Sequence, residues 1–142
     1  MELIVYCLSF EVALKAGPDV ADVTGEISRI VAASGVGEGS AHATVIGSTG
    51  SLTTIEYEAG AVEDFKRAIE RLAPPGIEYA HELAWHDGNG HSHVQAALMG
   101  PSLVLPVRGA NVRLGTWQQA VLVNHDARAR QRTVEVTILG QG

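Results

Sequence analysis

The sequence contains a single cysteine, Cys7, so no disulfide can form within the chain. A chain without disulfides fits a reducing compartment, and we expect a cytoplasmic protein. Long apolar runs are also missing, because the apolar N-terminal stretch, residues 2–14, is too short to span a bilayer. It also has Glu2 where a secretory signal would carry positive charge, so we expect neither a membrane anchor nor a leader.

Positive charge is scarce, because 10 lysines and arginines are set against 16 acidic residues, which gives a net charge of −6. Duplex binding needs a broad cationic surface, so nucleic acid is not an expected partner. The bases are unevenly distributed, and residues 101–142 carry five arginines and only two acids. A local anion site near this C-terminal segment is therefore compatible with an acidic chain.

The compositional signs of disorder and of several domains are absent as well. The chain is 46% hydrophobic and 18% charged, which is ordinary for a globular protein. Its 142 residues suffice for one core and are too few for two, and the sequence has no repeat and no interdomain linker. We therefore expect a single domain over residues 1–142.

Alternating side chains indicate the strands. Residues 2–14 follow a period of two, with apolar side chains on both faces. Residues 41–47 and 52–58 flank the turn STGS, and this arrangement predicts a hairpin. The remaining strands are expected over residues 77–85, 102–107, 116–124 and 133–139.

Two longer helices and one short helix complete the expected elements. The first begins near Thr24, a plausible N-cap, and ends at Gly35. The second covers residues 62–73 and stops at the Pro74–Pro75–Gly76 run. Its apolar stripe lies opposite its charges and consists of Val62, Phe65, Ile69 and Leu72. The short third helix is expected over residues 93–100.

Histidines gather in the stretch WHDGNGHSHVQ, residues 85–95. In extended backbone, His91 and His93 would lie on one side, a common arrangement for two metal ligands, whereas a helix would splay them. They fall where we expect a loop to become a helix. A third ligand would have to come from His81, His86 or Asp87, and hydrogen-bonded loop histidines are the alternative.

Nucleotide-binding motifs are missing. The run GVGEGS follows a helix and lacks the third glycine of a dinucleotide fingerprint, and GSTGS has no lysine for a P-loop. No nucleotide cofactor is expected. Glu56 lies opposite the apolar face of its strand, where a solvated carboxylate is the default. Arg128, Arg130 and Arg132 share a face if extended, either as a solvated edge or as a phosphate clamp.

Several segments together resemble the YjbQ-like family, described as secondary thiamine-phosphate synthases. They are GSTGSLTTIEYE, YAHE, DGNGHSHVQAALMGPSLVLPV, LGTWQQAVLV and RARQRTVEVTILG, and the resemblance extends over nearly the whole chain. It implies an α+β fold with two packed β-sheets, sandwich-like, and assembly as a homotrimer. The two main helices and the short third helix are compatible with that fold.

The resemblance also implies a polar pocket that includes Glu56, His81, Asn89, His91, His93, Ser102, Trp117 and Gln118, and the chemistry of these side chains and of the arginines suggests roles for them. Glu56 and His93 would be catalytic, and His81, His91 and His93 would hold a divalent metal such as zinc or magnesium. Substrate would contact a further set, Asn89, Ser102, Trp117, Gln118 and Arg130. One departure is Gly47, which stands where many family members carry a histidine. A role of that histidine cannot be transferred, and the substrate can differ with it.

Three functions are compatible with these observations. The resemblance implies the joining of hydroxymethylpyrimidine diphosphate to thiazole phosphate with loss of pyrophosphate. The histidines suggest a metal-dependent hydrolase or transferase acting on another phosphorylated metabolite, with three protein ligands and an open fourth position. A trimeric protein that binds a small anion without catalysis is the third. Stoichiometric zinc would favour the second.

Overall fold

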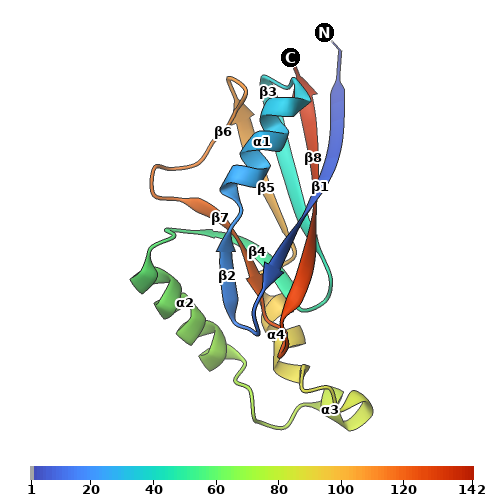
Figure 1. Cartoon of the computed structure of the whole chain (residues 1–142), viewed down its shortest axis with the longest axis vertical. Helices are drawn as coiled ribbons and strands as arrows, with labels where there is room; N and C mark the ends of the chain where they lie inside the picture. The colour runs from blue at the N-terminus through green and yellow to red at the C-terminus, as the bar shows by residue number, and fades with distance from the viewer. Residues whose placement is uncertain (1) are drawn as a thin grey trace.

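The computed structural model describes residues 2–142, and its larger sheet is antiparallel with five strands (Figure 1). In spatial order the strands are β1 (Ile4–Leu14), β8 (Arg130–Gln141), β3 (Glu38–Ile46), β5 (Ser102–Arg108) and β6 (Asn111–Val112). Ile4 pairs with Gly140, and the N- and C-terminal ends of the chain therefore lie side by side.

The smaller sheet has three antiparallel strands, β2 (Asp19–Asp22), β7 (Gln119–Asn124) and β4 (Gly50–Ile55). Its central strand, β7, is buried throughout apart from Gln119, because both faces of this sheet are covered. Leu122 and Ala120 face the main core between the sheets, and Val121 and Val123 face the opposite side. The two packed sheets of the α+β fold confirm the expected fold class.

Helix α1 (Thr24–Ser34) packs on the inner face of the larger sheet. Ile27, Ile30 and Val31 are buried there, at the spacing that the sequence predicted. Gly35 ends the helix with φ 77°, a left-handed conformation that glycine adopts without steric cost. Together with the smaller sheet, α1 closes the main core over the inward side chains of β1, β3, β5 and β8.

Helix α2 (Ala59–Leu72) covers the other face of the smaller sheet. The Glu58 carboxylate accepts hydrogen bonds from the backbone N–H groups of Gly60 and Ala61 and so caps the helix N-terminus. Ile69 is buried against β7, with Val62 and Phe65 packed around it. The helix expected over residues 62–73 is confirmed, and it begins three residues earlier.

Two expectations about the sheets are wrong. Residues 77–85 contain no strand but a short helix, α3 (Ala80–Trp85), whose following loop is held by local hydrogen bonds. The Glu82 carboxylate accepts from the N–H groups of Gly88 and Gly90. The hairpin is also wrong, because β8 and β5 occupy both edges of β3, and β4 pairs with β7 in the other sheet.

A fourth helix, α4 (Gly90–Met99), follows α3 at the end of the molecule away from the two chain termini (Figure 1). The expected short helix over residues 93–100 is therefore present and starts earlier, so His91 and His93 both lie on it. Residues 2–142 thus contain one helix more than expected. Within residues 2–142, no helix combines the length and apolarity needed to cross a membrane.

Candidate functional site

Three side chains with metal-ligating atoms meet between α3 and α4. His81 lies on α3, Asp87 in the following loop and His93 on α4, and one potential ligand atom of each lies within 4.8 Å of the others. His81 Nε2 is 3.0 Å from Asp87 Oδ1, and the rings of His81 and His93 meet edge to face with centroids 4.5 Å apart. We call His81, Asp87 and His93 the trio.

Backbone groups orient the trio. His93 Nδ1 lies 3.3 Å from the carbonyl oxygen of Ser48, which can only accept a hydrogen bond. Nδ1 therefore carries the proton, and Nε2 is left with a free lone pair. The Asn89 N–H donates to Asp87 Oδ1 over 3.0 Å. This bond is the main reason that the pKa of the Asp87 carboxyl lies below its ordinary value.

A hollow of about 380 Å³ adjoins the trio. Its lining comes from the turn between β3 and β4, the α3–α4 segment, the β7–β8 loop and the start of β8. The lining residues are Gly47, Ser48, Thr49, Asp87, Asn89, His93, Asp126, Arg130, Gln131 and Arg132. Because polar and charged side chains dominate this list, the hollow suits a charged ligand better than an apolar one.

Asp126 organises the charges in the lining of the hollow. Its Oδ2 lies 3.0 Å from Arg130 Nε and accepts a hydrogen bond from Thr49 Oγ1 at 2.9 Å. Burial alone would raise the pKa of Asp126, but the Arg128 amide, the Thr49 hydroxyl and Arg130 outweigh it and lower the pKa. Asp126 therefore stays ionised and fixes Arg130 at the rim.

Asn89 and His91 have different surroundings. Asn89 is buried, and its Oδ1 accepts a hydrogen bond from the Ala127 N–H at 2.9 Å, which ties the α3–α4 segment to the end of β7. His91 points away from the trio, with its ring 6.5 Å from that of Tyr79. Residues two apart on a helix face in nearly opposite directions, so α4 brings only His93 of this pair to His81.

The other predicted site residues lie outside the hollow. Glu56 follows β4 and is exposed, at the end of the strand opposite to Gly50. Gln118 Nε2 donates to Thr54 Oγ1 near the same end, and the neighbouring Trp117 is 72% exposed. Ser102 lies on the outward face of the larger sheet, with its Oγ 2.8 Å from Thr44 Oγ1.

The comparisons with known proteins give the family. A family model described as UPF0047 protein YjbQ-like matches residues 9–141. The chain belongs to this family. It is 30% identical over 116 residues to a UPF0047 protein of Archaeoglobus fulgidus, which covers 82% of this chain and 88% of the relative.

Two crystal structures share the UPF0047 fold of this chain. A YbjQ-like protein from Sulfolobus solfataricus superposes with a TM-score of 0.94 at 31% identity, over 99% of this chain and 100% of the other. A hypothetical protein from Aeropyrum pernix gives 0.88 at 33% identity, with the same coverage. Neither these two proteins nor the Archaeoglobus relative is named for a substrate or a reaction, so family membership establishes the fold and leaves the chemistry to be argued from the site.

The sequence of this UPF0047 chain predicted neither the buried His125 nor the burial of Arg132, which was named only as part of a solvated edge or a phosphate clamp. Arg132 is only 6% exposed, and its Nη2 donates to Thr49 Oγ1 and to Asn124 Oδ1. His125 is fully buried, between Gln95 Oε1 at 2.9 Å from Nδ1 and Ser51 Oγ at 2.7 Å from Nε2. Burial, with the charges of Arg132 and His91, lowers the pKa of His125 to about 4.

Proposed function

We propose that this UPF0047 protein binds a divalent metal ion through His81, Asp87 and His93 and acts with it on a phosphorylated small metabolite. The observation that carries the proposal is the meeting of these three side chains beside a hollow whose lining also includes Arg130 and Arg132. Three protein ligands with an open fourth position are the usual arrangement of a catalytic zinc site.

The donor set favours zinc over magnesium. Two imidazoles and one carboxylate are typical zinc ligands, whereas magnesium takes oxygen ligands almost exclusively. The set differs from the one expected from the sequence, because Asp87 takes the place of His91. His93 would bind through Nε2, since its Nδ1–H is directed at the Ser48 carbonyl oxygen. The Asn89 N–H keeps Asp87 ionised and ready to bind a cation.

The charges of the hollow suit an anionic ligand better when a cation is present. Its lining contains two aspartates, Asp87 and Asp126, and two arginines, Arg130 and Arg132, whose formal charges cancel. A divalent cation at the trio would leave an excess of two positive charges. A phosphate monoester dianion matches that excess, and guanidinium groups match phosphate geometry.

The residues around the hollow would have different roles in such a reaction. A divalent metal supplies Lewis acidity and lowers the pKa of bound water. Arg130, fixed by Asp126, would bind the phosphate at the rim of the hollow. The trio would hold the reacting end of the ligand close to the phosphate, so that both are oriented by groups attached to rigid elements.

The joining of hydroxymethylpyrimidine diphosphate to thiazole phosphate is a narrower form of this proposal. The diphosphate of the first substrate would bind to the metal and to the arginines of the hollow. This reaction would also need Trp117 for stacking and Glu56 for proton transfer, which within one chain lie at the other end of β4. From the rise per residue of a strand, that end is roughly 20 Å from Gly50. The broader class, metal-dependent hydrolysis or transfer, needs only the residues around the hollow and is therefore the form we favour.

Metal content tests the proposal directly. Protein from zinc-supplemented growth should retain about one zinc per chain through dialysis, by elemental analysis. The zinc-loaded protein is then assayed for phosphate or pyrophosphate release from a panel of phosphorylated metabolites, and turnover should depend on the metal. Absence of bound zinc would overturn the proposal. Anion binding with zinc but without turnover would favour the non-catalytic alternative.

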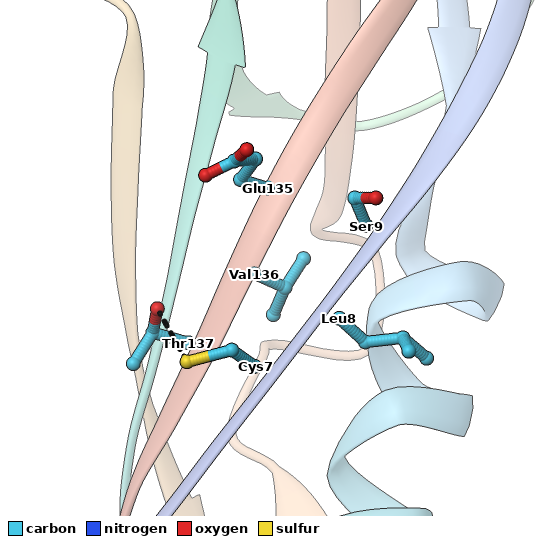
Figure 2. A pocket seen from close by; sticks show the side chains of 6 residues that line it. All are labelled: Cys7, Leu8, Ser9, Glu135, Val136 and Thr137. Carbon is cyan, nitrogen blue, oxygen red and sulfur yellow. Dashed lines mark hydrogen bonds between the residues drawn. The ribbon is translucent and has the colours of Figure 1, made fainter.

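We also propose that the chain forms a homotrimer through the outward face of the larger sheet. An antiparallel sheet normally presents polar side chains to solvent, but this face also exposes the apolar Val5, Val104 and Leu139. Figure 2 shows part of it, where Cys7 Sγ lies 3.7 Å from Thr137 Oγ1. Two rows of paired residues cross β1, β8, β3 and β5 on this face. One row consists of Val5, Leu139, Ser40 and Pro106, and the next consists of Cys7, Thr137, His42 and Val104.

A charge on this face should dissociate the trimer. The wild-type mass by light scattering should be about 45 kDa, three times the 15.0 kDa of one chain. Val5→Glu buries a carboxylate in the proposed interface and should give 15.0 kDa, because unpaired buried charges are strongly unfavourable. Leu72→Glu, on the exposed side of α2, is the control and should leave the mass unchanged. A monomeric wild type would contradict the proposal.

Subunit mixing tests whether Glu56 serves a neighbouring site. If Glu56 of one chain reaches the trio of another in the trimer, each site draws on two chains, and the following results are expected. Glu56→Gln and His93→Ala are each expected to abolish most of the turnover of a substrate found in the panel. Refolded together, they should recover a measurable part of it. A trimer without recovery would remove Glu56 from the site.

A further inference from the structure

Arg132 occupies a position where a sheet of this kind normally has an apolar side chain. On β8, the inward side chains are Val134, Val136 and Ile138, and Arg132 continues that series. A guanidinium that is 6% exposed is costly unless its donors are satisfied. Its burial is therefore expected to have a function.

The donors of Arg132 are only partly used. Nη2 donates to Thr49 and to Asn124, whereas Nε is buried without any hydrogen-bond partner, and Nη1 donates to no group in residues 2–142. No carboxylate within residues 2–142 forms an ion pair with this guanidinium, since the salt bridge of Asp126 is to Arg130. Arg132 therefore has positive charge and unused donors beside the hollow that it lines.

Two glycines leave room around these donors. Gly47 has φ +141°, and a Cβ there would lie 2.8 Å from Arg132 Nη1. A Cβ at Gly50 would lie 3.4 Å from Nε. The turn between them also contributes unused donors, because the backbone N–H groups of Ser48 and Thr49 make no hydrogen bond within the described residues. A side chain at position 47 would occupy the space in front of Nη1.

We propose that Arg132 and the turn at residues 47–49 form a subsite for a tetrahedral dianion, the terminal phosphate of the ligand, and that Gly47 determines specificity by keeping this subsite open. The inference rests on the proposed function for the nature of the ligand, with Arg130 binding at the rim and Arg132 at the base. It adds a second phosphate-binding group and a position at which the substrate range is set.

The wild-type protein tests the subsite without any metal. In ¹⁵N-labelled protein kept in EDTA, inorganic phosphate should shift the Arg132 Nε–H resonance and the amides of Gly47, Ser48 and Thr49 saturably. Sulfate should compete, and acetate at equal ionic strength should not. Shifts confined to exposed arginines such as Arg128, or equal competition by acetate, would overturn the proposal.

Two variants and a matched control complete the test. Arg132→Lys keeps a charge but loses the planar fork, and phosphate affinity should fall about tenfold or more, as expected for a lost charged hydrogen bond. Gly47→Ala should give a similar loss, and Arg128→Lys should give none. Melting temperatures identify a variant that does not fold, and in that case the wild-type titration decides.

Zinc separates this proposal from the proposed function. Arg132→Lys and Gly47→Ala should keep the zinc content of the wild type, because neither residue belongs to the trio. Phosphate shifts at Arg132 in a protein that binds no zinc would support the subsite and overturn the metal proposal alone. Stoichiometric zinc without phosphate shifts at Arg132 would overturn the subsite alone.

Discussion

Replacing His93 with alanine is expected to weaken zinc binding by at least about a hundredfold, since even loss of a residue that only orients a ligand costs up to that much. The structure gives the reason: His93 is the α4 member of the trio, and its Nε2 is free while Nδ1 is directed at Ser48. The remaining pair, His81 and Asp87, would have to hold the ion alone. Competition with a chromophoric chelator measures the change.

The controls for His93→Ala lie close in sequence and in chemistry. His86 is an exposed histidine at the end of α3 with φ 50°, so His86→Asn removes an imidazole at a backbone conformation that asparagine tolerates. Glu56→Gln removes a carboxylate at the far end of β4. Both should keep wild-type zinc affinity. Equal losses for His86→Asn and His93→Ala, at unchanged melting temperature, would contradict the assignment of the trio.

The periodicity of the sequence predicts those elements that bury one clear face. The helix at residues 62–73 and the strand at residues 133–139 are present because their apolar spacing matches one geometry only. The alternation over residues 77–85 led to the wrong prediction of a strand, since Ile77, Leu83 and Trp85 are exposed and belong to no sheet. Alternation indicates a strand only when a neighbouring strand supplies hydrogen bonds.

The partner of a strand is not encoded in its own pattern. The short turn after β3 is typical of a hairpin, but β3 already has β8 and β5 on its two edges. The chain therefore leaves the sheet at Gly47, whose φ of +141° few other residues adopt, and β4 enters the smaller sheet. The same turn, residues 47–49, that connects the two sheets instead of forming a hairpin also lines the hollow.

The candidate site could be predicted only in part. Histidine clustering pointed to the segment that contains Asp87 and His93, but which histidines converge depends on α4 starting at Gly90, which splays His91 from His93. Arg132 could have been found, because it continues the inward series of β8 and an arginine in such a series is unusual. The alternation of three arginines instead suggested a shared surface, and only the fold separates the exposed Arg128 from the buried Arg132.

His125 is expected to make the protein less stable as the pH falls from 6.5 to 4. Its folded pKa of about 4 lies below the ordinary value of 6.5, so between these values the unfolded chain binds a proton that the folded chain does not. Above pH 6.5 this imidazole is neutral in both the folded and the unfolded chain, and its contribution to stability is fully present. The free energy of unfolding should therefore fall by about 3 kcal/mol across this range, at 1.36 kcal/mol per pKa unit.

The hydrogen bonds around His125 show why its neutral form is the folded form. Gln95 Nε2 donates to Ala73 O, so Gln95 Oε1 faces His125 and accepts from Nδ1–H. Nε2 is then the acceptor for the Ser51 hydroxyl. A second proton on Nε2 would reverse that bond and place a positive charge in the core, near Arg132.

Urea unfolding of wild type and His125→Gln at pH 7.0, 5.5 and 4.5 isolates the effect. The variant is expected to be less stable at pH 7.0, because Ser51 and Gln95 lose a well-placed partner, but it should lose much less stability on acidification. Asp126 does not interfere, since its pKa lies below an ordinary value of 3.8, and its contribution is lost only at lower pH. If both proteins lose the same free energy between pH 7.0 and 4.5, then another group titrates, and the pH dependence does not come from His125.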